Sequence, residues 1–165
     1  MAENFFVKEG TKEEKYKSLI PQLTALLQGE EDLIANLSNT VSVLKMGMGF
    51  FWVGFYLVKE NELVLGPFQG SVACTRIQKG RGVCGASWDK AQTIIVEDVE
   101  KFPGHIACSS LSKSEIVLPI FNNSGDVLAV LDVDEDKLSA FDHTDEIYLT
   151  QVCKLVAPYF EYAHN

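Results

Sequence analysis

Hydrophobic positions recur at helical spacing in three stretches of the chain. In the first stretch, Thr11 and Glu14 form the pattern of a capping box, in which each residue satisfies a backbone amide of the other. Pro21 falls inside this stretch and could kink or break the helix. The spacing predicts helices over residues 11–29, 31–46 and 142–162.

Between these helices, aromatic and β-branched runs with turn residues at their ends are typical of strands. The predicted strands are residues 50–59, 62–69, 75–78, 93–96, 115–121 and 127–134. Residues 122–125 give a strong hairpin signal, and a glycine-rich loop at 80–85 leads into a short helix predicted over 86–91. We therefore predict an α+β fold, in which a mostly antiparallel sheet is flanked by N-terminal and C-terminal helices, in a single domain covering residues 1–165.

Composition narrows the function classes. The chain has 165 residues, 47% of them hydrophobic, which is enough for one domain with a substantial core. The net charge of −9, without a basic stripe, argues against nucleic-acid binding. No signal peptide or membrane-spanning run is found, so a cytoplasmic location is expected. Four cysteines would then be thiols at rest.

Three of these cysteines lie in or beside predicted loops. Cys74, Cys84 and Cys108 have no CxxC partner, so a zinc ribbon is not expected, and a metal or protease site with His105 is weakly supported. The alternative is that these three cysteines are small buried hydrophobic residues without a chemical role. Cys108 differs because it lies in a polar turn, where backbone amides would favour the thiolate. Cys153 falls on the apolar face of the last helix and is predicted to be core.

Carboxylates and aromatic side chains give two further signals. Strand alternation places Leu128, Asp132 and Asp134 on one face of the strand predicted at 127–134. Glu115 opens the neighbouring strand. This arrangement fits either a solvated sheet edge or an acidic pocket. Trp52 and Tyr56 likewise share a strand face, which fits either core packing or a wall for a small ligand.

Six runs together resemble the free methionine (R)-sulfoxide reductases. They are WVGFY at 52–56, LGPFQG at 65–70, GRGVCG at 80–85, FPGHIAC at 102–108, SEIV at 114–117 and LDVD at 131–134. The similarity covers residues 10 to 160 in order. It implies a GAF fold and thioredoxin-dependent reduction of free, not peptide-bound, methionine (R)-sulfoxide, without a metal or organic cofactor.

The resemblance also implies roles for individual residues. Cys108 matches the nucleophile, Cys74 its recycling partner, and Cys84 a third cysteine with a subsidiary role. The resemblance assigns Glu115, Asp132 and Asp134 to the pocket carboxylates and Trp52 and Tyr56 to the aromatic wall. Because clustered carboxylates raise one another's pKa, our own candidate for the acid that protonates the leaving oxygen is Glu115 or Asp134. We expect backbone amides of the turn at Ile106 and Ala107 to bind the substrate carboxylate.

The sequence departs from the family pattern at two positions, and functions other than sulfoxide reduction are also considered. Phe51 replaces a residue that is usually polar in the family, and Ser109 replaces an expected acidic residue, so pocket shape or thiol acidity could differ. Competing hypotheses are a GAF sensor that binds a small ligand without turnover, a thiol redox sensor, and a purely structural protein. Fold analogy also suggests a homodimer through the N-terminal helices.

Overall fold

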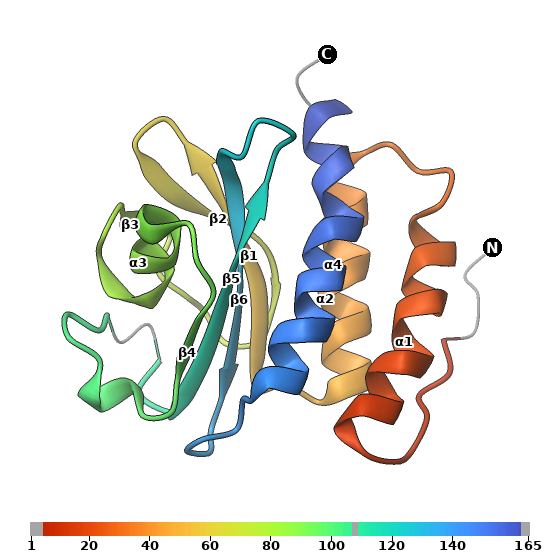
Figure 1. The fold of residues 1–165 in the computed structure, drawn as a ribbon, viewed down its shortest axis with the longest axis horizontal. Helices are drawn as coiled ribbons and strands as arrows, with labels where there is room; N and C mark the ends of the chain where they lie inside the picture. The colour runs from red at the N-terminus through yellow and green to blue at the C-terminus, as the bar shows by residue number, and fades with distance from the viewer. Residues whose placement is uncertain (1–4, 107–108, 163–165) are drawn as a thin grey trace.

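The computed structural model describes residues 5–106 and 109–162. Within them, four α-helices, one short 3-10 helix and six strands follow one another along the chain (Figure 1). In chain order they are α1 (Lys12–Leu27), α2 (Leu33–Met48), β1 (Trp52–Lys59), β2 (Glu62–Gln69), β3 (Arg76–Gln78), α3 (Gly82–Lys90), β4 (Ile94–Val96), η1 (Val99–Lys101), β5 (Ser114–Phe121), β6 (Val127–Glu135) and α4 (His143–Tyr162). None of these helices is long and apolar enough to span a membrane.

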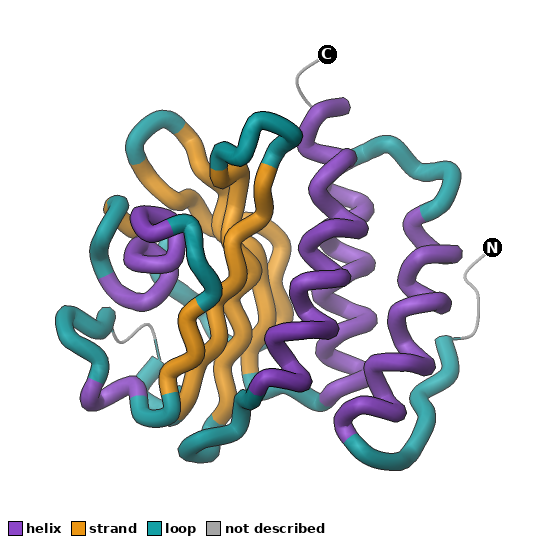
Figure 2. Tube along the Cα trace, in the orientation of Figure 1, coloured by secondary structure: helices purple, strands orange, loops and turns teal. Residues whose placement is uncertain are grey.

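The strands form one antiparallel sheet in the order β3-β2-β1-β6-β5-β4. Helices α2 and α4 cover one face and α1 packs against them on the side away from the sheet, whereas α3 lies on the other face (Figures 1 and 2). This arrangement confirms the predicted α+β fold with helices from both chain ends. It also gives the molecule two separate interiors, one on each face of the sheet.

The core between the sheet and the three helices is almost entirely apolar, and we call it the helix-side core. Val53 and Phe55 of β1 point into it, together with Leu131 and Val133 of β6. The alternate residues of the same strands point to the opposite face, where a smaller cluster that includes Trp52, Tyr56 and Trp88 packs against α3; we call it the site-side core. Cys153 lies in the helix-side core as predicted, 4% exposed.

Strand alternation fails at one point. The sequence places Leu128 with Asp132 and Asp134, but Leu128 packs against the helix-side core and Val127 against the site-side core. The register between β5 and β6 shifts near this end, between Ile120 and Phe121. An extra residue in a ladder reverses the alternation beyond it, so the faces follow the prediction only from residue 129 onward.

Helix boundaries follow the capping residues. The Thr11–Glu14 capping box opens α1, which passes through Pro21 without a break because Pro21 is on the exposed side. The Asp32 side chain accepts a hydrogen bond from the Ala35 amide at the start of α2. Helix α3 begins at residue 82, four residues before its predicted start, so the glycine-rich loop forms its first turn.

A buried ionic cluster ties α1 to the start of α4. Asp145 is fully buried and accepts a hydrogen bond from the Tyr16 hydroxyl at 2.8 Å. It also forms an ion pair with Lys12 and accepts from the backbone amide of Asp142 at 2.9 Å. The carboxylate therefore caps α4 and binds two side chains of α1, which sets the distance between the two helices.

The two outer strands of the sheet are short. β3 pairs with β2 over residues 62–64, and β4 pairs with β5 over residues 115–117. Past each of these stretches the inner strand carries a proline, Pro67 in β2 and Pro119 in β5. Proline has no amide hydrogen to donate, so it is found in strands where a ladder is not continued.

The Asp145 cluster predicts a large effect on stability. Asp145→Ala leaves the buried Tyr16 hydroxyl without its acceptor and removes a cap, so we expect the free energy of unfolding to fall by about 3–5 kcal/mol. Urea denaturation at pH 7 measures it. Lys17→Ala, which removes the exposed Glu13–Lys17 pair on the same helix and leaves Glu13 in place, is the control and should change the stability far less. Equal effects of the two variants would contradict this role of Asp145.

Candidate active site

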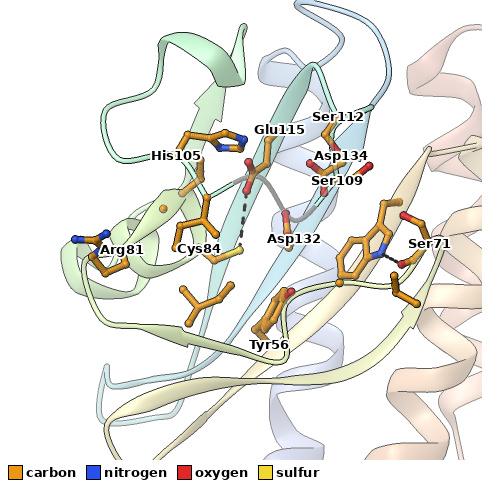
Figure 3. Close-up of a pocket in the computed structure, with 17 residues that line it drawn as sticks. Tyr56, Ser71, Arg81, Cys84, His105, Ser109, Ser112, Glu115, Asp132 and Asp134 are labelled. Atoms are coloured by element: carbon orange, nitrogen blue, oxygen red, sulfur yellow. Dashed lines mark hydrogen bonds between the residues drawn. The ribbon is translucent and has the colours of Figure 1, made fainter.

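A pocket opens on the face of the sheet covered by α3 (Figure 3). Strands β1, β5 and β6 form its floor, and the start of α3 forms one wall. The other lining residues include Ser71, Val72, Ala73, His105, Ile106, Ser109 and Ser112. The pocket therefore lies where the site-side core meets the loops. The predicted site residues Trp52, Tyr56, Cys84, Ile106, Glu115, Asp132 and Asp134 all line it.

Three carboxylates converge on this pocket from two adjacent strands. Glu115 of β5 lies directly opposite Asp134 of β6, and Asp132 follows two residues away on the same face. Glu115 and Asp132 are each only 6% exposed, and Asp134 is partly buried. All three carboxylates line the pocket and two of them are buried, so the cluster lies in a pocket and not on a solvated sheet edge.

Cys84 completes the cluster from the first turn of α3. Its Sγ lies 4.0 Å from Oε1 of Glu115, and one ligand atom from each of Cys84, Glu115 and Asp132 lies within 4.8 Å of the others. Figure 3 shows these three side chains pointing toward one another. The approach depends on Gly85, because a Cβ there would lie 2.4 Å from the Gln78 carbonyl oxygen and push α3 away.

Burial raises the pKa values of these groups, and repulsion between neighbours adds to the rise for Glu115, Asp134 and Cys84. Burial, Asp132 and Asp134 raise the pKa of Glu115 well above its usual range. Burial also raises the pKa of Asp132 to about 6, although hydrogen bonds from Cys84 and Glu115 oppose the rise. Burial and the charge of Asp132 raise the pKa of Asp134. Burial and the charges of Asp132 and Glu115 raise the pKa of the Cys84 thiol. Burial therefore favours the protonated forms of Glu115 and Asp134 more than those of isolated carboxyl groups.

The described lining residues offer little compensating positive charge. Arg81 is exposed, and in Figure 3 its side chain lies on the far side of Cys84 when seen from Glu115. Burial lowers the pKa of His105, which favours the neutral ring. Oδ1 of Asp132 and Nδ1 of His105 are buried and have no hydrogen-bond partner among the described residues. Unpaired buried polar atoms are rare, so the pocket offers acceptors suited to a cationic or hydrogen-bonding ligand.

The aromatic wall is fixed by hydrogen bonds from its polar atoms. Trp52 Nε1 donates to the Ser71 carbonyl at 3.0 Å, and the Tyr56 hydroxyl donates to the Cys74 carbonyl at 2.9 Å. The Trp52 ring stacks between Tyr56 and Phe68, with centroid distances of 6.2 and 5.4 Å. Both rings belong to the site-side core and line the pocket, so packing and ligand contact are not exclusive roles.

The cysteines differ in state and surroundings. Cys74 is partly buried and disulfide-bonded, whereas Cys84 and Cys153 are free and buried. Ala107 and Cys108 lie outside the described residues, so the predicted nucleophile and one of the two predicted backbone donors are not placed. Ile106 and Ser109, on either side of them, both line the pocket.

Several lining residues were not predicted from the sequence. They include Ser71, Arg81 and Ser112, which lie in loops that line the pocket or at the start of α3. One available signal was Gly70, whose φ of +142° and close approach to Trp52 exclude a side chain. Glycines bordering an aromatic strand residue could thus have marked the segment that encloses the pocket.

Comparison with known proteins identifies the family of the chain. A family model described as a GAF domain matches residues 28–161. The chain is 62% identical to GAF domain-containing protein A of Dictyostelium discoideum, over 94% of this chain and 99% of that protein. It is 43% identical to the free methionine-R-sulfoxide reductase of Saccharomyces cerevisiae, over 88% of this chain and 85% of the yeast protein.

A solved structure gives the same result for the fold. The free methionine-R-sulfoxide reductase of Neisseria meningitidis, determined in complex with its substrate, superposes with a TM-score of 0.93 at 48% identity. The match covers 97% of this chain and 96% of the other. The chain therefore belongs to the GAF-domain family and, within it, to the family of the free methionine-R-sulfoxide reductases.

Proposed function

We propose that this chain reduces free methionine (R)-sulfoxide to methionine, with Cys108 as the nucleophile. The observation that carries the proposal is the buried carboxylate cluster in a pocket with an unpartnered Asp132 oxygen. This arrangement suits a small ligand with a cationic group. The 48% identity to a reductase solved with its substrate makes methionine sulfoxide the best candidate for that ligand.

The carboxylates account for a preference for the free amino acid. In the proposed complex, the substrate ammonium binds between Asp132 and a neighbouring carboxylate, and the backbone amides at Ile106 and Ala107 bind its carboxylate. Trp52 and Tyr56 enclose the methyl end. A peptide-bound sulfoxide has no ammonium at this position, so the buried carboxylates would lose their cationic partner.

The first chemical step transfers the sulfoxide oxygen from the substrate sulfur to the sulfur of Cys108. The Cys108 thiolate attacks the sulfoxide sulfur, and the sulfoxide oxygen takes up a proton. The hydroxyl then passes from the substrate sulfur to the Cys108 sulfur, and the sulfur–sulfur bond formed in the attack breaks. Methionine leaves with its sulfur reduced by two electrons, and Cys108 is oxidised to a sulfenic acid. The proton comes from a carboxylic acid of the pocket. Glu115 is our first choice, because burial, Asp132 and Asp134 keep it protonated, and Asp134 is the second.

A disulfide then regenerates the enzyme. Cys74 attacks the sulfenic sulfur, water leaves, and thioredoxin reduces the resulting disulfide by two electrons. The disulfide-bonded state of Cys74 beside the pocket supports this role. Cys84 is a poor thiolate at neutral pH, because burial and Asp132 raise its pKa, so we give it the subsidiary role.

The setting of the enzyme is also proposed. Thioredoxin-linked thiol chemistry fits a reducing cytoplasm, and the acidic net charge fits neither nucleic acid nor a membrane surface as partner. A homodimer through the N-terminal helices is supported by Ile34 and Met46 of α2, which are 55% and 58% exposed.

The disulfide favours one alternative, a thiol redox sensor without sulfoxide turnover. In that case peroxide would oxidise Cys74 and Cys108, and no sulfoxide would be consumed. The substrate assay below separates these functions, because only a reductase couples sulfoxide to thioredoxin oxidation.

Thioredoxin-coupled NADPH consumption tests the proposed function. We expect turnover with free methionine (R)-sulfoxide, little with the (S) epimer, and at least about 100-fold lower kcat/KM with the N-acetylated (R)-sulfoxide. Cys108→Ser should abolish turnover. Cys153→Ser, which alters a free thiol in the helix-side core, should retain it. Folded, reduced protein that turns over none of these sulfoxides would refute the reductase proposal.

The pH profile tests the acid. Because Glu115 must be protonated to donate, kcat should fall as the pH rises through its elevated pKa. Glu115→Gln cannot deliver a proton, so we expect kcat to fall by about 10²–10⁴ and this alkaline limb to disappear. Single-turnover kinetics between pH 5 and 9 measure both effects.

The comparison variants separate the two candidate acids. Glu62→Gln changes a carboxyl on β2 outside the pocket and should leave the profile unchanged. An alkaline limb that persists in Glu115→Gln but disappears in Asp134→Asn would transfer the role of acid to Asp134.

A further inference from the structure

We propose that Cys84, Glu115 and Asp132 form a binding site for a divalent cation of the zinc class. These three groups come from α3, β5 and β6, so three separate elements hold them around one point. The inference goes beyond sulfoxide reduction, because it concerns a metal ion that is neither substrate nor cofactor of that reaction.

The distances among the donors are close to those of a zinc site. Zn–S and Zn–O bonds of about 2.3 and 2.1 Å at tetrahedral angles put sulfur and oxygen about 3.6 Å apart and two oxygens about 3.4 Å apart. Here Sγ of Cys84 and Oε1 of Glu115 are 4.0 Å apart, and all three donors lie within 4.8 Å of one another. Small side-chain rotations, without backbone movement, would close the site.

A second observation points independently to a ligand at this place. Oδ1 of Asp132 is buried and has no hydrogen-bond partner among the described residues, and the whole residue is 6% exposed. Burying a carboxylate oxygen without a hydrogen-bond partner costs free energy, unless a donor or a cation binds to that oxygen. The described lining residues place no buried cationic side chain there, since Arg81 is exposed. A bound cation would satisfy this oxygen.

The donor set selects the kind of metal. One thiolate and two carboxylates suit zinc or cobalt, whereas magnesium and calcium prefer sites made of oxygen alone. Three protein donors leave a fourth position that faces the pocket and can be filled by water. Cys84 and Glu115 must release their protons when the metal binds, so metal binding competes with protons at these two groups.

The scaffold around the donors is rigid. β5 and β6 are adjacent inner strands, and Glu115 and Asp132 lie on their shared face. Helix α3 is held against the preceding segment by the close approach of Gly85 to the Gln78 carbonyl and by backbone hydrogen bonds between Gly80 and Gly85 and between Gly85 and Arg81. A site on fixed elements loses little conformational entropy when it binds a metal.

The metal site has a consequence that rests on the proposed function. The carboxylates that would hold the substrate ammonium are the metal donors, so a bound zinc ion and the substrate exclude each other. The site is therefore inhibitory, and zinc would stop the reductase without altering a cysteine covalently.

Cobalt titration tests the site without any turnover. Metal-free protein with Cys74 disulfide-bonded, as in the structure, is titrated with Co²⁺ while the near-ultraviolet thiolate-to-cobalt absorption is recorded. We expect one equivalent of Co²⁺ to bind and to produce this absorption band. Added Zn²⁺ should displace the bound Co²⁺ and remove the band. Cys84→Ser should lose the band, and Glu115→Gln should weaken Co²⁺ binding at least about tenfold. Cys153→Ser, which changes the other free cysteine that the structure describes, should bind as the unaltered protein does.

A missing band in the unaltered protein, a band that persists in Cys84→Ser, or a band lost in Cys153→Ser would each overturn the proposal. If Cys84→Ser does not fold, as judged by circular dichroism, unchanged Co²⁺ affinity in folded Glu115→Gln would overturn it instead. Because the readout is metal binding, protein that binds Co²⁺ but reduces no sulfoxide would keep the metal site and lose only the proposed reductase function.

Discussion

The burial of two carboxylates side by side on the inner strands of the sheet is the constraint on which the site depends. An ionised carboxylate that leaves water costs several kcal/mol, and two neighbours increase that cost. Glu115 and Asp132 respond with raised pKa values, and so they exist as acids or as acceptors for a cation. Their environment thus supplies both functions that the proposed chemistry requires, a proton for the leaving oxygen and a partner for the ammonium.

The division of the sheet into two faces allows this burial. On one face, the aliphatic residues of β1 and β6 pack against α2 and α4 in a core without carboxylates from the strands. On the other face, the alternate residues of the same strands carry Trp52, Tyr56, Asp132 and Glu115. Stability therefore comes mainly from the helix-side core, while the polar groups occupy a face that contributes less apolar burial.

Much of this architecture could be read from the sequence, for definite physical reasons. Capping residues such as Thr11 and Asp142 act locally, so the helix starts near them were predictable. Alternation placed Asp132 and Asp134 on one face, but not Leu128, because the register shift beside Phe121 depends on pairing with β5. The start of α3 and the loop residues of the pocket escaped prediction because contacts distant in sequence determine them, such as Gly85 against Gln78 and Trp52 against Ser71. The roles of Cys74, Cys84 and Cys108 came from resemblance rather than from spacing.

The short outer strands and the prolines beyond them bear on how these molecules behave when crowded together. An exposed strand edge can template pairing with another molecule and so begin aggregation. Here an incoming strand would meet the half-buried Pro67 on the β2 margin, which lacks the hydrogen that intermolecular pairing needs, whereas Pro119 of β5 is buried. Together with a net charge of −9, this feature should keep the native protein dispersed at high concentration, so that a sheet built for chemistry on one face does not become a seed for fibrils at its edges.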